Sequence, residues 1–423
     1  MRKLFLIISI SILPITAGQK QTTLLFPPFK HTWGIHKGTE EKLDLILGDK
    51  TDFDNPQGLT CTRLKSWDDP KDDEDDAEVT AFGVNSGRGE IIYNSSMYSL
   101  AIYGKRGSGV GEMSNPHGIC STEDGNVYVA DTGNRRIVHL YIKKDKLNWV
   151  KPLGADSLIE PFDVKVIPGD TLFISDAGRN SIVVMDSSGK FIAEFKKLFS
   201  PRGLDVDAPN FRWSAYKDNF IIVADSLGKR IVKLDRSTGK ILTIVRMSQL
   251  GMIDADLMFV ALDFLDNIYV TDSVRCQVHK FDRNLNYLTS VGQCGTDDEQ
   301  FNHPRGIAIW RRFGQIVIAE KNSAQYYWVG VDVSNFKMDF DAAARKITVS
   351  LFVTEEAYIK AVLEGKDDFK LGSKRRIKAG KQELEFTIPN NIPAGKYDAV
   401  FTIEATYSSK GHFDKKFERE IKF

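Results

Sequence analysis

The sequence predicts an all-β fold in which repeated four-stranded units form a ring and a smaller β domain follows them. Three observations predict it. A run of turns and short strands, from Asn115 to Ile137, recurs along the chain; the copies lie 45 to 49 residues apart; and the strand pattern changes register after Lys346. Pro and Gly clusters separate runs of β-branched and aromatic residues, which is the pattern of β-hairpins.

Each repeat has a polar anchor residue at the end of its second strand. The anchors are separated by 46, 45, 49, 47 and 48 residues, and they are Asn85, Asp131, Asp176, Asp225, Asp272 and Glu320. A fixed period of about 20 to 50 residues indicates a repeat architecture. One four-stranded unit cannot bury both faces of its sheet, so six units predict a six-bladed β-propeller over residues 42–335.

The N-terminus has the pattern of a secretory signal. Arg2 and Lys3 precede the apolar residues 4–15, and small residues follow at 16–18, so residues 1–18 are predicted to be a signal peptide. A membrane anchor is the alternative, but roughly twelve apolar residues are fewer than the ~20 that span a bilayer. We therefore expect a secreted or periplasmic protein without a membrane span.

Residues 19–41 form a polar lead-in, which we expect to be extended, and residues 42–48 read as a strand without an earlier partner. Because the sixth repeat supplies three strands, we expect 42–48 to be its fourth, which closes the ring and removes a sheet edge. The boundary of the propeller is predicted at Met338–Arg345. Strand-like runs and turns over 346–423 then predict a small immunoglobulin-like β-sandwich.

The stretch from Asn115 to Ile137 resembles the NHL repeat, and residues of about 40 to 335 resemble a six-repeat NHL β-propeller. The glycine-rich linker over residues 104–112 resembles the connector that precedes such a repeat. The resemblance implies the fold. It leaves the function open, because propellers serve both as binding modules and as enzymes.

The composition narrows the classes of partner. Lys and Arg balance Asp and Glu at 57 each, so no overall field favours nucleic acid or an anionic membrane. The acidic run 68–76 lacks the spaced Gly and final Glu of a calcium loop and is interpreted as a solvated surface loop. No phosphate-binding loop or nucleophile-elbow motif is present.

The anchors themselves are interpreted as structural. The set Asp131, Asn134 and Arg136 resembles a site, but Asp225 with Arg230 and Asp176 with Asn180 repeat parts of it. A turn that recurs in several blades is expected to use its Asp to accept backbone N–H groups at the turn into the third strand, as in an Asx-turn.

The residue after each repeat-opening Pro differs from blade to blade and begins an innermost strand. These residues are therefore expected to form a rim ring at one mouth of the channel: Gln57, His117, Phe162, Arg202, Met258 (placed by alignment, since its Pro is absent) and Arg305. Two Arg, one His and one Gln would suit a carboxylate or phosphate. The alternative is that these side chains solvate the rim or pair with neighbouring acids.

Two metal alternatives were considered. The amidating lyases are NHL-type propellers that hold zinc through several His residues, but here His117 stands alone at such a position, and one imidazole does not complete a catalytic zinc site. Lactonase-like propellers hold calcium at the channel, for which Asp163, Asp205 and Asp263 are the candidates. The prediction is no bound cofactor, with calcium as the alternative.

Four Cys residues fit an oxidising compartment. Cys276 and Cys294 flank a predicted hairpin and are the preferred disulfide. Cys61 and Cys120 lie on equivalent strands of neighbouring blades, one register apart. Four free thiols remain the alternative.

These features favour an exported NHL-repeat propeller that acts as a binding or scaffolding module for a protein, peptide or glycan partner. A hydrolase or lyase with a channel-mouth site, with or without a metal, is the alternative.

Overall fold

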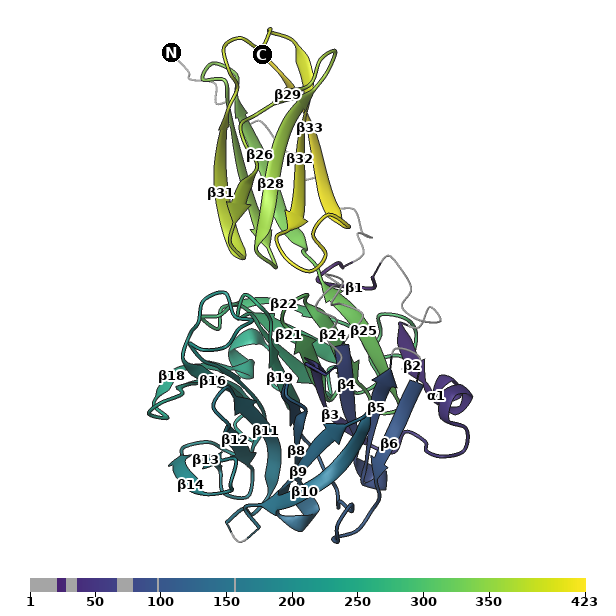
Figure 1. Ribbon diagram of the computed structural model, residues 1–423. Coiled ribbons are helices and arrows are strands. Elements are labelled where there is room, and N and C mark those ends of the chain that lie inside the picture. Colours follow the sequence, from purple (N-terminus) through teal and green to yellow (C-terminus); the bar gives the residue numbers. More distant parts are fainter. Residues whose placement is uncertain (1–20, 28–35, 67–78, 97–98, 156) are drawn as a thin grey trace.

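The computed structural model describes residues 21–27, 36–66, 79–96, 99–155 and 157–423 (Figure 1). The predicted signal peptide (1–18) and the acidic run 68–76 lie outside these residues. Among the helices of the described chain, none has the length and apolar character needed to cross a bilayer.

The larger part of the described chain forms six antiparallel sheets. The first contains β3 (Pro56–Arg63), β4 (Val79–Asn85), β5 (Glu90–Ser96) and β6 (Ser99–Gly104). The second contains β7 (Ile119–Ser121), β8 (Asn126–Asp131), β9 (Arg136–Lys143) and β10 (Lys146–Leu153). The third contains β11 (Pro161–Ile167), β12 (Thr171–Asp176), β13 (Ser181–Asp186) and β14 (Phe191–Phe195).

The remaining three sheets follow the same plan. The fourth contains β15 (Pro201–Asp207), β16 (Phe220–Asp225), β17 (Arg230–Asp235) and β18 (Ile241–Arg246). The fifth contains β19 (Leu257–Leu262), β20 (Ile268–Asp272), β21 (Gln277–Phe281) and β22 (Tyr287–Val291). The sixth contains β23 (Ile307–Trp310), β24 (Gln315–Ala319) and β25 (Ser323–Val329), and two N-terminal strands complete it.

The first strand of each sheet lies innermost. Strands β3, β7, β11, β15, β19 and β23 contact one another in this order, and β23 contacts β3. Main-chain hydrogen bonds join neighbouring sheets: Gly58 N donates to His117 O at 2.9 Å, and Gly118 N donates to Phe162 O at 2.8 Å. A Cβ atom on either glycine would lie under 3 Å from the next sheet, so Gly permits this approach. The predicted β-propeller arrangement is confirmed.

The anchor residues are buried, and each holds the loop that precedes the innermost strand of its own sheet. Asp131 accepts Ser114 N at 2.7 Å, Asp176 accepts Glu160 N at 2.9 Å, and Asp272 accepts Asp256 N at 3.1 Å. Asn85, Asp225 and Glu320 do the same for Asp54 N, Phe199 N and Asn302 N. A buried carboxylate satisfies loop donors that have no sheet partner. The anchors therefore have a structural role, as expected, but the expected place of their bonds was only partly right. Asp176 and Asp272 also accept the N–H groups of Arg179 and Arg275 at the turn into the third strand, whereas the contacts to the loop before the innermost strand were not expected.

The closing strand of the sixth sheet was placed on the wrong segment. Residues 42–48 were expected to form it, but α1 (Glu40–Leu47) occupies that position, and β1 (Leu24–Leu25) and β2 (Lys37–Thr39) both pair with β25. The alternation in the sequence suggested a strand. However, Leu43 and Leu47 lie four residues apart, so both are buried on one helical face, and Glu40 and Glu41 suit the first turn of a helix.

The C-terminal part forms two further antiparallel sheets around one apolar core. One sheet contains β26 (Val333–Asp341), β27 (Lys346–Val353) and β31 (Gly380–Thr387). The other contains β28 (Ala357–Glu364), β29 (Phe369–Lys370), β30 (Arg375–Ile377), β32 (Lys396–Ala405) and β33 (Asp414–Lys422). The immunoglobulin-like assignment stays a prediction.

The boundary between the two parts lies earlier than predicted. Strand β26 pairs with β27, so the C-terminal unit begins at Val333, inside the range assigned to the propeller. Phe336, Met338 and Phe340 alternate toward the C-terminal core. This alternation is the signal that placing the boundary at Met338–Arg345 overlooked.

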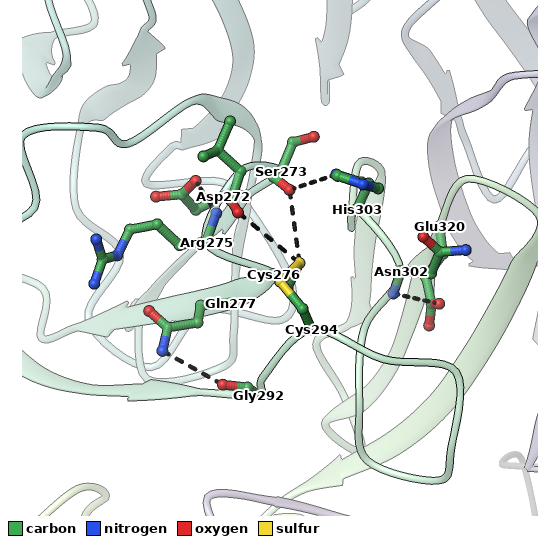
Figure 2. Close-up of a disulfide and its surroundings, with 11 residues drawn as sticks. Asp272, Ser273, Arg275, Cys276, Gln277, Gly292, Cys294, Asn302, His303 and Glu320 are labelled. Carbon is green, nitrogen blue, oxygen red and sulfur yellow. Dashed lines mark hydrogen bonds between the residues drawn. A yellow bond between two sulfur atoms is a disulfide. The ribbon is translucent and has the colours of Figure 1, made fainter.

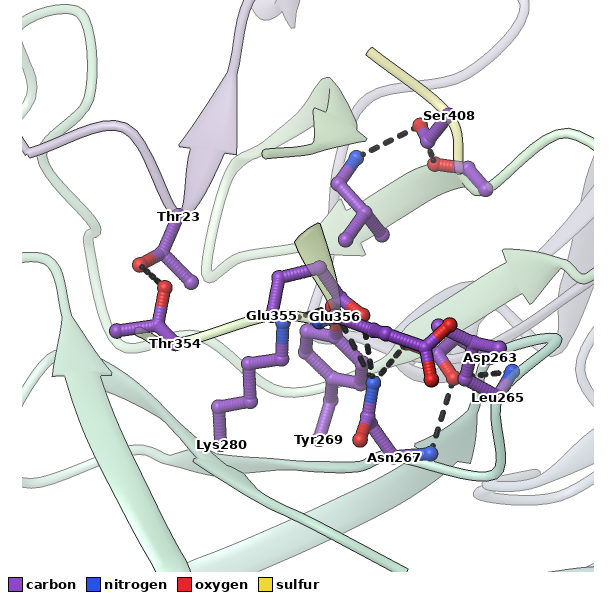
Figure 3. A network of polar contacts seen from close by, with 12 residues as sticks. Thr23, Asp263, Leu265, Asn267, Tyr269, Lys280, Thr354, Glu355, Glu356 and Ser408 are labelled. Carbon is purple, nitrogen blue, oxygen red and sulfur yellow. Dashed lines mark hydrogen bonds and ion pairs between the residues drawn. The ribbon is translucent and has the colours of Figure 1, made fainter. Parts of the chain in front are cut away.

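The C-terminal unit docks on the propeller through buried polar contacts (Figure 3). Lys280 on β21 forms an ion pair with Glu355, both side chains being fully buried, and Asn267 Nδ2 donates to Glu355 at 3.1 Å. Thr23 and Thr354 hydroxyls lie 3.1 Å apart. Burial, together with the charge of Asp263, raises the pKa of Glu355 to about 7, against the opposing effect of Lys280. The two parts are therefore in direct contact.

Candidate functional site

The structure brings the predicted rim ring together at the end of the channel where the innermost strands begin. The ring centroids of His117 and Phe162 lie 4.5 Å apart, and Arg202 lies over Phe162 at 5.9 Å. Arg202 also contacts Met258, with its Nη1 atom 2.9 Å from Sδ. These residues pack against each other around the mouth.

The donors of the rim ring are largely engaged within it. Arg202 forms an ion pair with Asp256 at 2.6 Å. Arg305 donates to the side chain of Asn55, which also accepts a hydrogen bond from Gln57 Nε2 at 3.1 Å. Guanidinium groups already paired in this way are poorly available to an incoming anion. The structure thus favours the alternative interpretation, in which the rim side chains pair with their neighbours.

His117 is held neutral at this end. Its Nδ1 lies 2.9 Å from the hydroxyl of Thr132. Burial, reinforced by the positive charges of Arg202 and Arg305, lowers the pKa of His117 to about 4. An imidazole in this setting is a packing and hydrogen-bonding group at neutral pH.

A cavity of about 410 Å³ occupies the opposite end of the channel, where the innermost strands finish. No motif in the sequence predicted this cavity. Side chains from several sheets line it, including Cys61, Cys120, Lys165, Asp205, Trp310 and Arg311. A loop between β15 and β16 adds Phe211, Arg212 and Trp213. Its size is within the range of about 300–1,000 Å³ typical of small-ligand pockets.

Four cationic side chains line this channel cavity: Lys65, Lys165, Arg212 and Arg311. Lys165 and Arg311 stand on or next to innermost strands, and they differ in their partners. Arg311 donates to Asp205 and Asp207, at 3.2 Å each, and to Val206 O at 3.0 Å. Lys165 Nζ makes neither a hydrogen bond nor an ion pair within the described residues. Burial by itself lowers the pKa of Lys165, but the carboxylates of Asp163 and Asp205 outweigh it and leave the pKa raised. Lys165 is therefore a cation with free donors.

The aromatic side of the channel cavity also holds a donor that has no acceptor. Trp310 is 6% exposed, and its indole N–H has no hydrogen-bond partner within the described part of the chain. Trp213 packs against Trp310 with ring centroids 6.5 Å apart, and Arg212 lies over Trp213 at 4.5 Å. A buried indole N–H normally finds a partner, so a ligand with acceptor atoms would satisfy this one.

The three candidate calcium ligands do not fit a calcium site. Asp163 accepts Val164 N at 2.8 Å and Leu204 N at 3.0 Å, and its pKa is raised to about 6 by burial. Asp205 accepts Val206 N and Leu262 N, both at 2.8 Å. A calcium ion needs several oxygens that point at one centre, and these oxygens already accept N–H groups of separate strands.

Asp263 is engaged elsewhere. Its carboxylate accepts Leu265 N and Asn267 N at 2.9 Å and lies in the buried network that contacts Glu355 (Figure 3). Within the described chain, Glu40, Asp44 and Asp52 do group three carboxylates within 4.8 Å. The Glu40 carboxylate already accepts Phe53 N at 2.9 Å, and the other two residues are exposed.

The cysteines divide into one bonded pair and two thiols. Cys276 and Cys294 form a disulfide with a Cα–Cα distance of 4.9 Å, which is the pairing preferred from the sequence (Figure 2). It lies beside the anchor Asp272 and ties both ends of the β21–β22 hairpin. Cys61 and Cys120 are free and line the channel cavity, where burial raises the pKa of each thiol to about 12.

A positional signal for the channel cavity exists in the sequence. Lys165 and Arg311 stand at or just beyond the later half of innermost strands, where apolar residues are otherwise frequent. Their meaning depended on knowing that these strand ends converge. The loop that carries Trp213 is much longer than the equivalent connections of the second, third, fifth and sixth sheets, so the period did not predict where it lies.

The comparisons with known proteins agree with the fold. The NHL repeat family matches residues 113–140. A comparison with curated protein sequences finds no significant match.

Several solved structures are similar in fold. Virginiamycin B lyase from Staphylococcus aureus is 14% identical, with a TM-score of 0.43 over 59% of this chain and 76% of that chain. The Kuenenia stuttgartiensis hydrazine synthase is 13% identical, with a TM-score of 0.44 over 72% and 79%. A luciferin-regenerating enzyme is 13% identical, with a TM-score of 0.45 over 69% and 94%.

Proposed function

We propose that this protein is an exported binding module that holds an acidic segment of a protein or peptide partner in its channel cavity. The observation that carries the proposal is the imbalance of hydrogen-bonding groups there. Lys165 Nζ and the buried Trp310 indole N–H are donors without acceptors within the described residues, whereas the acceptors of Asp205 are engaged. A complementary ligand therefore brings acceptors, as peptide carbonyl and carboxylate groups do.

Two further features support a protein partner. The NHL repeat match supports it because such propellers generally mediate protein interactions. The exposed Arg212 and the half-buried Trp213 stand at the lip of the channel cavity. Trp and Arg are the residues most enriched at the energetic centres of protein interfaces.

The C-terminal unit adds a second surface at the same end. The Tyr407 hydroxyl donates to Arg311 O, so the C-terminal unit contacts a residue of the channel cavity lining. We infer that the unit supports the rigid position of Arg311. A partner seated in the channel cavity would then lie beside both parts of the protein.

The enzyme alternative has less support from the geometry. The carboxylates considered for a metal are engaged by backbone donors, and the two channel thiols have raised pKa values, which is unfavourable for nucleophiles because the thiolate is the reactive form. Elemental analysis of protein purified without chelator tests the metal part. A stoichiometric calcium or zinc ion would favour the enzyme alternative.

The binding proposal can be tested with matched variants. The mature protein is immobilised and exposed to an envelope extract, and any retained protein is identified and titrated by calorimetry against the wild type, Lys165→Met and Trp310→Phe. We expect both variants to weaken binding at least tenfold. Arg202→Ala, on the rim ring, is the control and should bind normally.

Two results would contradict the proposal. Equal affinity of Lys165→Met and the wild type would place the partner outside the channel cavity. If the immobilised protein retained an acidic glycan and no protein, the partner would be a glycan and not a protein or peptide. Circular dichroism of each variant separates loss of binding from loss of fold.

A further inference from the structure

The junction between the first and the sixth sheets has smaller side chains than the other five junctions. The residues two and four positions before each anchor face the preceding sheet. In five sheets they are large, buried and aliphatic: Val127, Val129, Leu172, Ile174, Ile221, Val223, Ile268, Val270, Ile316 and Ile318. In the first sheet the equivalent residues are Ala81 and Gly83.

The opposite wall of this junction is also reduced. The residue three positions before each anchor faces the following sheet, and in the first five sheets it is Phe82, Tyr128, Phe173, Ile222 or Tyr269. In the sixth sheet it is Val317. The buried apolar cluster between these two sheets is correspondingly small: Leu59, Ala308 and Ala319 with Cys61 and Val317. Side-chain volume is therefore missing from both walls of one junction.

The missing volume appears as a cavity of about 420 Å³ between the two sheets, here called the seam cavity. Helix α1 covers it with Leu43 and Ile46, and Phe53, Ile92 and Leu100 add apolar surface. Protein interiors are close-packed, so a space of this size between two sheets is unusual. Apolar surface that stays unfilled loses the contacts that would otherwise stabilise it.

The polar groups in the seam cavity lining are mostly satisfied by the protein. The Asn94 side chain accepts Ala81 N at 2.6 Å and donates to Val79 O at 2.9 Å. The Asn85 side chain accepts Asp54 N at 2.8 Å and donates to Asp52 O at 2.8 Å. The seam cavity therefore presents a largely apolar interior in which the side chains of Asn85 and Asn94 are already engaged.

One cation stands at its edge. Lys42 on α1 lines the seam cavity, and its Nζ donates to Lys37 O at 2.7 Å. An ammonium group has three donors, so two remain for another acceptor. An apolar interior with a cation at its edge is complementary to a chain-like molecule with a carboxylate head.

We propose that the seam cavity binds a single-chain amphiphile, a fatty acid, with its chain between the first and sixth sheets and its carboxylate at Lys42. This site is separate from the channel cavity, so the proposal is independent of the function proposed above. The bound chain supplies the apolar volume that Phe, Tyr, Ile or Val supplies at the other junctions.

The experiment uses dodecanoate as the probe and titrates the mature full-length protein by calorimetry. We expect one site, and we expect the double variant Ala81→Ile with Val317→Phe to lose measurable binding while its Tm without ligand rises. These substitutions restore the residue types of the other junctions. If the double variant does not fold, Ala81→Val alone should weaken binding at least fivefold.

Two controls define the site. Leu45→Ser changes a residue of α1 that is 82% exposed, and it should bind dodecanoate like the wild type. Lys42→Met should weaken the binding of dodecanoate at least fivefold and leave the binding of dodecanol unchanged. Absence of wild-type binding, or binding that persists in the filled variants, would overturn the proposal. Equal loss of dodecanol in Lys42→Met would overturn the assignment of the carboxylate.

Discussion

The two ends of the channel use similar residue types for different purposes. At the rim ring, Arg202 and Arg305 are paired with Asp256 and Asn55. At the channel cavity, Arg311 is paired, but Lys165 has free donors. The difference teaches that a ring of convergent polar residues is no site by itself. What distinguishes a site is whether its donors are already satisfied.

The rim residues differ from blade to blade, and this variation suggested a ligand site at the wrong end of the channel. The rim residues vary from blade to blade because each has a different neighbour to satisfy: Phe162 packs on His117, while Arg202 pairs with Asp256. The variation of the rim residues therefore reflects how each one packs or pairs with its neighbours. The contrast is between the rim ring, whose donors are paired, and the channel cavity, which has donors without acceptors. Substitutions at the two ends of the channel test it.

The largest expected effect is on the carboxylate that lies beneath the rim ring. Asp163→Ala should lower the free energy of unfolding by about 2–4 kcal/mol, because it leaves the buried N–H groups of Val164 and Leu204 without acceptors. Chemical denaturation measures it. Asp163→Asn keeps one acceptor and should lose less. A loss below about 1 kcal/mol for the Ala variant would show that the sheets here do not depend on this carboxylate.

The next effect is on the pH dependence of stability. The pKa of His117 is lowered from 6.5 to about 4 in the folded state, so the unfolded state binds a proton first as the pH falls. The contribution of neutral His117 is present above pH 6.5 and should be lost between pH 6.5 and 4, by on the order of 1–3 kcal/mol. Denaturation of the wild type and His117→Gln across this range measures it. Parallel pH curves would contradict the expectation.

A pair of substitutions should separate the two ends directly. Arg305→Ala removes hydrogen bonds to Asn55 and Pro56, so it should lower the free energy of unfolding by about 1–2 kcal/mol. It should not weaken the binding of the partner. Lys165→Met has no hydrogen bond to lose, but it removes the positive charge that favours the nearby carboxylates of Asp163 and Asp205, so it should also lower stability. Unlike Arg305→Ala, Lys165→Met should weaken the binding of the partner. The reverse pattern, measured by denaturation and calorimetry, would move the site to the rim ring.

The smallest expected effect is a gain in stability beside the channel cavity. Burial and the charge of Asp207 raise the pKa of Asp266 to about 7. The hydroxyl oxygen of Ser214 lies 3.1 Å from a carboxylate oxygen of each of these two residues. A raised carboxyl pKa means that stability falls as the pH rises from 3.8 to about 7. Asp266→Asn should therefore stabilise the protein at pH 8 by about 1 kcal/mol and by less at pH 5.

The geometry permits this substitution. Asp266 has a φ of 59°, a conformation that Asn tolerates well. Thermal unfolding at the two pH values measures the difference. An equal change at pH 5 and pH 8 would show that the charge of Asp266 is not the cause.

The propeller, the structural role of the anchors and the preferred disulfide could all be predicted from the amino-acid sequence. These features depend on local patterns: a period of 45 to 49 residues, an Asp or its equivalent at a turn, and two Cys residues beside one hairpin. Such patterns are readable because strand alternation and turn chemistry act over a few residues.

Three features depend on contacts between residues that are far apart in the sequence. They are the strands that close the ring, the channel end that has unsatisfied donors, and the place where the C-terminal unit docks. Helix α1 replaced the expected strand over 42–48 because burial of Leu43 and Leu47 on one side depends on the sheets beneath them. Trp310 and Lys280 are unremarkable in the sequence, and the position of Lys165 on an innermost strand gains its meaning only when the strand ends are known to converge. Their surroundings come from residues far away along the chain, and no local pattern encodes whether a buried donor finds its acceptor.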